Sequence, residues 1–359
     1  MRYADGLERG FEGTDVSVRQ EYPSTSPLAR RVHLGRVDSY LQRTVAHPRA
    51  LRSARADLFH IIDHAYASVA HALPAHRTVV TCHDLILLAV DRGDLPTRAR
   101  RAVGRYRRTV STMAKVAAVA CVSEATKRDV LRFTDVQPER IHVIPGGVGA
   151  GFRPMPPAQR SDARRRLGIE ARFVLLHVSS GGFYKNVPAT LRTMAALRSS
   201  GTDVALVRVG YPLRQDQREL ASRLGLAAHV KELGRPDDAE LTTIYGAVDA
   251  LIFPSLHEGF GLPVIEAMAC GTPVVASNIT ALDEVLGGAG LMAPPNDIHA
   301  LAAAVDQILS SPAAADRLRS AGLARAQSFQ WQRVVDDYRR LYTEVVQAAD
   351  EHDPVQLTA

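Results

Sequence analysis

Two glutamates with seven residues between them, Glu258 and Glu266, lie in a segment that also carries glycines and a proline. Gly259 and Gly261 predict a loop, and Pro263 suits the first turn of a helix, where its missing N–H group costs nothing. Free backbone N–H groups at such a helix start are a natural binding site for phosphate. A carboxylate one turn into the helix, as at Glu266, suits hydroxyl groups instead, such as those of a ribose.

The residues around these glutamates predict a strand, a glycine loop, a helix and a second strand. Residues 251–254 are a short apolar run, typical of a buried strand, and residues 255–261 form the loop. The helix that follows has one apolar face and ends at Gly271, before a strand over residues 272–276. An ordinary β-α-β unit with surface glutamates has the same outline, so the spacing alone leaves both interpretations open.

Two further candidates follow predicted strands. Lys185 comes after the strand 173–178 and the run SSGG at residues 179–182, which has phosphate-loop geometry without a Walker A or G-x-G-x-x-G spacing. His83 ends the strand 78–82, and ligands gather at the carboxyl ends of parallel strands. The alternatives are a surface lysine near a turn and a satisfied buried histidine.

Strands alternate with helices along most of the chain, which predicts mainly parallel sheets with helices on both faces. The same kind of unit is built twice, and 359 residues are comfortable for two domains. Residues 145–172, with PGG, PMPP and a charged run, predict the connection between them.

The segment 258–275, EGFGLPVIEAMACGTPVV, resembles the E-x7-E signature of the family-4 retaining glycosyltransferases, also called glycosyl transferase group 1. The glycines, Pro263, Glu266 and the GTPVV strand agree together, which makes the match specific. The resemblance implies the GT-B fold, an α/β architecture of two Rossmann-like, doubly wound domains that face a central cleft. It implies an acceptor-binding domain at residues 1–150, to which a C-terminal helix at residues 328–346 returns, and a nucleotide-sugar donor-binding domain at residues 151–327.

The resemblance also implies an activity: transfer of a sugar, with retention, from a nucleoside-diphosphate sugar to a glycan, lipid-linked or small-molecule acceptor. Neither a metal nor a cofactor besides the donor substrate is implied. Lys185 would pair with the diphosphate, Glu258 would contact hydroxyls of the transferred sugar, and Glu266 would hold the ribose. The implied catalytic residues are His83, Glu258 and Lys185, and the implied donor-binding residues are Gly181, Gly182, Lys185, Gly210, Gly234, Arg235, Glu258, Gly259, Phe260, Gly261, Leu262 and Glu266.

Two positions depart from the family's pattern. Ser179 and Tyr184 stand where the family often has basic residues. A non-catalytic sugar-nucleotide-binding subunit therefore stays open as an alternative, and so does a GT-B sugar-nucleotide epimerase. A phosphorylase would need a pyridoxal lysine, for which the sequence has no evident motif.

Membrane spans, signal peptides and cysteine spacing are the sequence features that bear on the compartment of the protein. No run is long enough to span a membrane, and MRYADGLERG does not have the pattern of a signal peptide. Cys82, Cys121 and Cys270 show no C-x-x-C spacing, which argues against a structural zinc site and suits a reducing, cytoplasmic setting.

The net charge is +6, although the sequence carries no nucleic-acid-binding motif. A peripheral contact with an anionic membrane would also suit this charge. Arginines crowd the predicted helix 98–116, where a solvated face is the alternative to a lipid contact: Arg98, Arg100, Arg101, Arg105, Arg107 and Arg108.

The N-terminal residues do not follow the family's usual opening, an apolar strand with a Gly- or Pro-rich loop. Tyr3, Leu7 and Phe11 recur every four residues, which predicts a helix over residues 2–11. Val16 and Val18 suggest a strand after it. We therefore expect the first strand of the N-terminal sheet to be missing and the sheet to be interrupted or rearranged beside this helix.

Overall fold

The computed structural model describes residues 2–22, 47–89 and 97–352. The chain divides into two compact units, of which unit 1 combines Met1–Gly146 with Trp331–Ala359 and unit 2 is Gly147–Gln330. Each unit has a parallel sheet of its own. The predicted α/β class with two parallel-sheet domains is therefore confirmed.

Unit 2 is built on a six-stranded parallel sheet in the order β10-β9-β8-β5-β6-β7. Successive strands run outward from β5 to β7 and from β8 to β10, so the order reverses between β5 and β8. Ligands of open α/β sheets bind at such a switch point, beyond the carboxyl ends of the strands. The strands are β5 (Phe173–Ser179), β6 (Val204–Gly210), β7 (Val230–Glu232), β8 (Ala250–Phe253), β9 (Val274–Ser277) and β10 (Leu291–Ala293).

Helices cover this sheet. The α-helices are α8 (Pro157–Arg166), α9 (Val187–Ser199), α10 (Gln215–Arg223), α11 (Asp238–Ala247), α12 (Leu262–Ala269), α13 (Thr280–Leu286), α14 (Ile298–Ser310) and α15 (Pro312–Ala326). Short 3-10 helices lie at Phe183–Lys185, Ala227–His229 and Gln327–Phe329.

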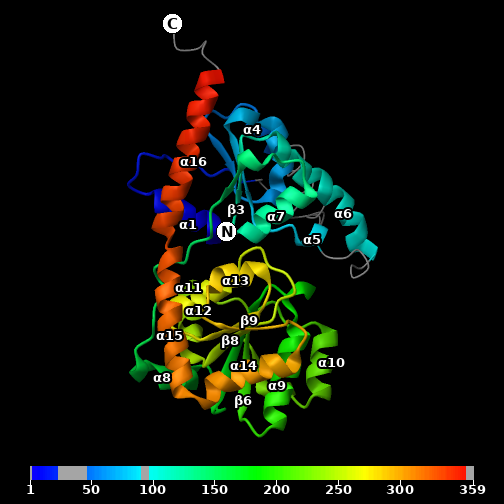
Figure 1. Cartoon of the computed structure of the whole chain (residues 1–359), viewed down its shortest axis with the longest axis vertical. Coiled ribbons are helices and arrows are strands. Elements are labelled where there is room, and N and C mark those ends of the chain that lie inside the picture. The colour runs from blue at the N-terminus through cyan, green and yellow to red at the C-terminus, as the bar shows by residue number, and fades with distance from the viewer. Residues whose placement is uncertain (1, 23–46, 90–96, 353–359) are drawn as a thin grey trace, which may run out of the picture. The chain divides into compact units, whose positions relative to one another are not determined.

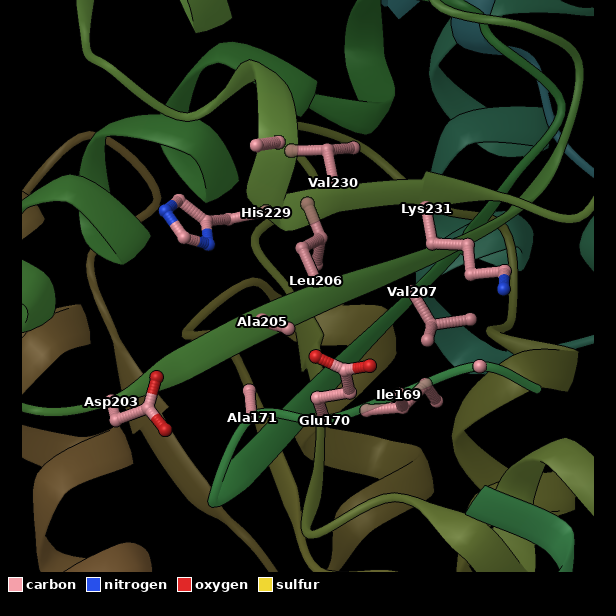
Figure 2. A pocket seen from close by; sticks show the side chains of 12 residues that line it. Ile169, Glu170, Ala171, Asp203, Ala205, Leu206, Val207, His229, Val230 and Lys231 are labelled. Atoms are coloured by element: carbon pink, nitrogen blue, oxygen red, sulfur yellow. The ribbon is translucent and has the colours of Figure 1, made fainter. Parts of the chain in front are cut away.

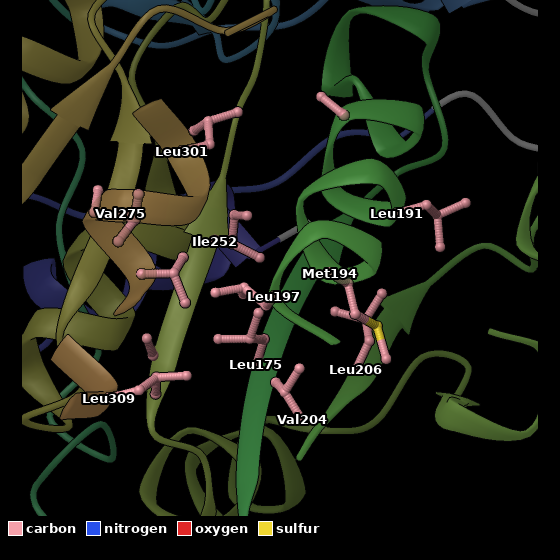
Figure 3. Close-up of a cluster of buried hydrophobic side chains, with 14 of the residues drawn as sticks. Leu175, Leu191, Met194, Leu197, Val204, Leu206, Ile252, Val275, Leu301 and Leu309 are labelled. Atoms are coloured by element: carbon pink, nitrogen blue, oxygen red, sulfur yellow. The ribbon is translucent and has the colours of Figure 1, made fainter. Parts of the chain in front are cut away.

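Apolar side chains fill the space between this sheet and two of its helices, α9 and α14 (Figure 3). Leu175 of β5 and Leu206 of β6 pair in register, and both are fully buried. Met194 of α9 and Leu301 of α14 belong to the same cluster. Strands covered on both faces need near-continuous apolar runs, which explains why the sequence pattern reveals them.

Unit 1 contains a four-stranded parallel sheet in the order β1-β2-β3-β4. Its strands are β1 (Phe59–Ile61), β2 (Thr78–Cys82), β3 (Ala118–Cys121) and β4 (Ile141–Val143). Its α-helices are α1 (Arg2–Phe11), α4 (His47–Leu51), α5 (Ile86–Ala89), α6 (Thr97–Val110), α7 (Glu124–Phe133) and α16 (Trp331–His352). Short 3-10 helices lie at His64–Ala72, Ala75–Arg77, Ser111–Lys115 and Pro138–Arg140.

Helix α1 is the first described element, as the sequence predicts, and it packs against α16 (Figure 1). Its stripe of Tyr3, Leu7 and Phe11 is buried. The Tyr3 hydroxyl lies 2.8 Å from that of Tyr338 in α16. Helix α16 is therefore part of the core of unit 1.

A strand after α1 and an interruption of the sheet are two further expectations for this region, and the first of them is wrong. Residues 16–22 have no regular structure, so the strand suggested by Val16 and Val18 is not formed. Among the described residues the four strands of unit 1 pair without a break, and β1 stands at one edge. The expected interruption of the sheet is thus not found in the part of the chain that the structure describes.

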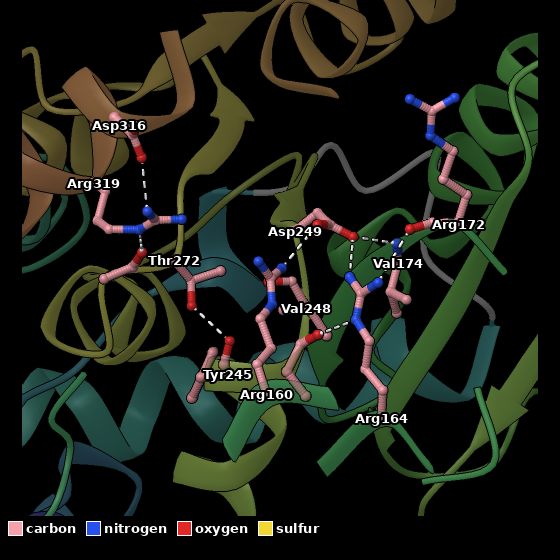
Figure 4. A network of polar contacts seen from close by, with 12 residues as sticks. Arg160, Arg164, Arg172, Val174, Tyr245, Val248, Asp249, Thr272, Asp316 and Arg319 are labelled. Carbon is pink, nitrogen blue, oxygen red and sulfur yellow. Dashed lines mark hydrogen bonds and ion pairs between the residues drawn. The ribbon is translucent and has the colours of Figure 1, made fainter. Parts of the chain in front are cut away.

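Helix α8 corrects the interpretation of residues 145–172 as a connection. Its sequence, PAQRSDARRR, has no apolar stripe, and only Ala163 is buried. Polar contacts hold it instead, because Arg160 and Arg164 both bind the carboxylate of Asp249 (Figure 4). The same carboxylate accepts a hydrogen bond from Val174 N at 2.7 Å, so it joins α8 to two neighbouring strands of the sheet.

We expect Asp249→Asn to lower the free energy of unfolding of unit 2 by about 2 kcal/mol, because two arginines lose their shared charge partner in a partly buried site. The Asp249 side chain is 18% exposed, so the loss is smaller than for a fully buried pair. Urea unfolding measures the change. Asp162→Asn, which removes an exposed ion pair with Arg165 on the same helix, is the control and should change little. Equal stability of the two variants would contradict this account of α8.

Candidate functional site

The loops that carry the predicted donor-binding residues of unit 2 leave the carboxyl ends of four adjacent strands, β8, β5, β6 and β7. Lys185 follows β5, and Glu258 follows β8, its neighbour across the reversal of strand order. Gly210 ends β6, and Gly234 follows β7. The sheet therefore brings these loops together at the carboxyl ends of its strands. The sequence pattern indicates only that each loop follows a strand, and it does not show which loops are neighbours.

Lys185 and Glu258 form an ion pair at these carboxyl ends. Lys185 Nζ donates to Glu258 Oε1 at 2.7 Å and to Oε2 at 2.9 Å. The side chains are 12% and 7% exposed. Nζ also lies 5.2 Å from the ring centres of both Tyr184 and Phe253, so aromatic faces add to its stabilisation. The sequence assigns both residues to the donor but gives no sign that they bind each other.

Helix α12 begins as predicted beside this pair. Gly261 is its N-cap with a φ of 116° and a ψ of 50°, and Pro263 lies in its first turn. A Cβ at Gly261 would stand 2.8 Å from Leu282 Cδ2, so both conformation and space favour glycine. The first turn of α12 thus presents backbone N–H groups next to the Glu258 loop.

Glu266, one turn into α12, is 5% exposed. Its Oε2 accepts a hydrogen bond of 2.9 Å from the hydroxyl of Tyr245, which is fully buried in α11. A hydrogen bond donated to one oxygen of a carboxylate holds the group in one orientation and so sets where its other lone pairs point. Sequence analysis missed Tyr245, whose spacing from Leu241 and Ile244 in the helix gives it the pattern of an ordinary core residue.

Glycines allow the chain to pass closely between the ends of β5, β6 and β7. Gly210 N donates to Gly234 O at 2.6 Å. Gly210 has a φ of 120°, and a Cβ there would lie 1.8 Å from Ser179 O, so no other residue fits. Tyr211, missed by sequence analysis, is 48% exposed and carries the guanidinium of Arg235 at 4.7 Å from its ring centre.

His83 belongs to unit 1, at the end of β2. Its Nε2 lies 2.8 Å from Ile62 O, and because a carbonyl only accepts, Nε2 carries the proton. In a neutral ring, Nδ1 is then the nitrogen that carries the lone pair. The ring meets Tyr3 edge-on with centres 4.8 Å apart, so α1 helps to hold it. In its neutral form, the imidazole can accept a hydrogen bond from a hydroxyl at Nδ1.

A hollow of about 520 Å³ lies at the opposite, amino ends of the unit 2 strands, near the first residues of β6 and β7 (Figure 2). Asp203, His229 and Lys231 are among its lining residues. None of the predicted donor-binding residues is among the described residues that line it. The hollow is therefore separate from the carboxyl-end site.

The arginines of α6 are described only in part. Arg105, Arg107 and Arg108 are exposed. The side chains of Arg98, Arg100 and Arg101 lie outside the described residues. Contact of this helix with lipid stays a prediction. Within the described ranges, no helix combines the length and apolar character needed to cross a bilayer.

Comparison with known proteins places both units in one family. The sequence profile described as Glycosyl transferases group 1 matches residues 159–325, and the one described as Glycosyltransferase Family 4 matches residues 11–150. O-antigen chain mannosyltransferase B of Escherichia coli is 28% identical over 311 residues, which are 83% of this chain and 80% of that protein. Three other Escherichia coli mannosyltransferases named WbdA are also 28% identical, but the chain spans only 34–35% of their length.

Solved structures show the same fold. Sucrose-phosphate synthase from Thermosynechococcus elongatus superposes with a TM-score of 0.75 at 23% identity, over 97% of this chain and 93% of that one. Anabaena HepE, solved in complex with UDP-glucose, superposes with a TM-score of 0.73 at 22% identity, over 90% and 85% of the two chains. Fold and sequence thus define a GT-B glycosyltransferase. The chain belongs to the group 1 glycosyltransferases of family 4, which confirms the resemblance inferred from its glutamates.

Proposed function

We propose that the enzyme transfers a sugar, with retention and without a metal, from a nucleoside-diphosphate sugar bound to unit 2 to an acceptor bound to unit 1. The ion pair of Lys185 with Glu258, beside the first turn of α12, carries this proposal. A diphosphate at these carboxyl ends would meet one ammonium group and the positive end of a helix dipole. The relative HepE, whose solved complex contains UDP-glucose, supports a donor of this class.

The proposed reaction needs these residues for two purposes, to stabilise the departing diphosphate and to orient the reacting groups. As the bond between the anomeric carbon and the diphosphate oxygen breaks, negative charge grows on the diphosphate, and Lys185 and the α12 N–H groups stabilise it. The acceptor oxygen bonds to the anomeric carbon on the same face, and its proton passes to the departing phosphate. His83 and Glu258 would then orient hydroxyl groups, and Glu266 would hold the ribose. The base would lie near Gly210, Gly234 and Arg235, where Tyr211 offers an exposed ring.

A donor screen tests this function. Thermal shift with UDP-, GDP- and ADP-sugars should reveal at least one stabilising donor, because ligands that bind only the folded state raise the melting temperature. NMR of the product formed with that donor should show retained anomeric configuration, and EDTA should leave the rate unchanged. No stabilisation by any donor, an inverted product, or loss of activity in EDTA would each contradict the proposal. Binding without turnover across a wide acceptor panel would favour the non-catalytic alternative.

The role of Glu266 has its own test. Glu266→Gln should lower kcat/KM by a factor that corresponds to about 1–3 kcal/mol, because it loses charge-assisted hydrogen bonds to the ribose. It should also reduce the preference for a ribonucleoside diphosphate over its 2′-deoxy analogue, measured by titration calorimetry. Tyr245→Phe, which removes the hydroxyl bonded to Glu266, should show a weaker effect in the same direction. Unchanged discrimination in a folded Glu266→Gln protein would place the ribose elsewhere.

A further inference from the structure

A charged side chain lies inside unit 2, close to the proposed diphosphate position. Arg208 of β6 is 1% exposed. It stands in one register row with His177 of β5 and Glu232 of β7. Registered residues of parallel strands project from the same face, so these three side chains lie side by side. The next row on that face is the pair of Ser179 and Gly210, at the carboxyl ends of the strands.

The guanidinium of Arg208 reaches toward that end of the sheet. Nη2 donates to Ser179 Oγ at 3.2 Å, and Nη1 donates to Tyr211 O. Its carboxylate partner is distant, with 3.9 Å between Nη1 and Glu232 Oε2, and this oxygen also accepts from Leu213 N. Nε is buried with no partner among the described residues.

The charge of Arg208 is thus incompletely compensated. Burial lowers its pKa, Glu232 counteracts this, and the neighbouring Arg214 lowers it further. Lys185 at the carboxyl ends of the strands differs, because both oxygens of Glu258 bind it. A buried charge without a close partner destabilises the fold, and an anion nearby reduces this effect.

Ser179 connects this charge to the site. A guanidinium has donors only, so Ser179 Oγ must accept from Arg208, and its own proton points elsewhere. No acceptor for that proton is found among the described residues. Ser179 is the last residue of β5, directly before the glycine turn at residues 180–182 that leads to Lys185. Its hydroxyl is therefore a prepared donor at the start of the phosphate-loop segment.

We propose that Arg208 is a positioning residue of the diphosphate subsite, which turns the Ser179 hydroxyl toward a phosphate oxygen and adds positive charge beneath the glycine turn. This inference rests on the proposed donor site of unit 2. Arg208 does not itself touch the donor. Its role differs from that of Lys185, since Arg208 carries a fixed buried charge and Lys185 must exchange Glu258 for the diphosphate.

The test compares ligands with and without phosphates. Titration of the full chain with UDP and GDP, and with uridine and guanosine, gives affinities for wild type, Ser179→Ala, Ser179→Thr and Arg208→Lys. We expect Ser179→Ala to weaken binding of the better diphosphate about tenfold, as loss of a hydrogen bond to a charged group does, and to change nucleoside binding less than twofold. Ser179→Thr should restore most of the diphosphate affinity, and Arg208→Lys should lie between.

Controls separate this role from folding. Thr193→Val removes a buried hydroxyl in α9 that has no hydrogen-bond partner in the described part of the chain, and it should leave all affinities unchanged. Ser179→Ala keeps the packing of β5, so the test stands even if the Arg208 variant does not fold. Equal weakening of diphosphate and nucleoside, or unchanged diphosphate affinity in folded Ser179→Ala, would overturn the inference alone. A wild-type chain that binds neither diphosphate would overturn the proposed donor site as well.

Discussion

Replacing Lys185 with methionine should lower kcat by about two to three orders of magnitude, with a much smaller rise in the KM for the donor. The reason is that negative charge on the departing diphosphate is greatest in the transition state, where the ammonium group stabilises it most. In the substrate complex, the gain from binding phosphate is partly offset because Lys185 must leave Glu258. Steady-state kinetics with the donor found by the screen measures both constants.

A double-mutant cycle separates catalysis from stability at this pair. Lys185→Met leaves the Glu258 carboxylate buried without its partner, which should cost about 3–5 kcal/mol of unfolding free energy. Lys185→Met with Glu258→Gln should recover most of that stability and none of the activity. Glu258→Gln alone should bind a bare nucleoside diphosphate more tightly, since its amide competes less for Lys185. A double variant with restored turnover would show that the diphosphate does not depend on Lys185.

Lowering the pH from 7 to 5 should destabilise each unit by about 2 kcal/mol per buried histidine. Burial, with a smaller contribution from His83, lowers the pKa of His60 in unit 1 to about 3, from an ordinary 6.5. Burial, with smaller contributions from Arg208 and Lys185, lowers the pKa of His177 in unit 2 to about 3 as well. The folded units keep both rings neutral, while the unfolded chain takes up protons below pH 6.5. This stability is therefore fully present above pH 6.5 and is lost, at about 1.4 kcal/mol per pH unit and ring, as the pH falls toward 3.

The single tryptophan, Trp331, belongs to unit 1, so its fluorescence follows unfolding of that unit in urea. His60→Gln can keep the contacts of His60 with Tyr342 and Thr81, and it should flatten the dependence of stability on pH by one proton. His71→Gln, at an exposed position of the same unit, should leave the slope as in wild type. Identical slopes for wild type and His60→Gln would contradict the assignment.

The sequence contains the local features of the donor site but not the contacts across it. Gly261, Pro263 and an apolar stripe specify where α12 begins, because these signals act within one turn of chain. The pairing of Lys185 with Glu258 depends instead on β5 lying beside β8, and strand order is set by packing of whole helices on the sheet. Arg208 is buried between the neighbouring strands β5 and β7 and under the loop after β6, so the sequence of its own strand carries no such signal.

Helix α8 escaped prediction for a related reason. The helical pattern depends on apolar residues that recur along one face, whereas Arg160 and Arg164 attach α8 through charge to Asp249, more than 80 residues away. The prediction of a strand at Val16 and Val18 is wrong for the opposite reason, because the sequence pattern is present but the strand is not formed. Alternation of two valines satisfies a strand pattern, but no described strand pairs with that segment.

Helix α16 belongs to unit 1 although all of unit 2 precedes it in the chain. The Tyr338 hydroxyl of this helix meets those of Tyr3 in α1 and Thr81 in β2, so it is this helix that connects the two elements by hydrogen bonds. On the ribosome, unit 2 is synthesised whole and can fold while the earlier part of unit 1 still lacks this partner. Unit 1 can therefore complete its core only after unit 2 has been synthesised, and we expect its N-terminal segments to need protection from aggregation until α16 emerges.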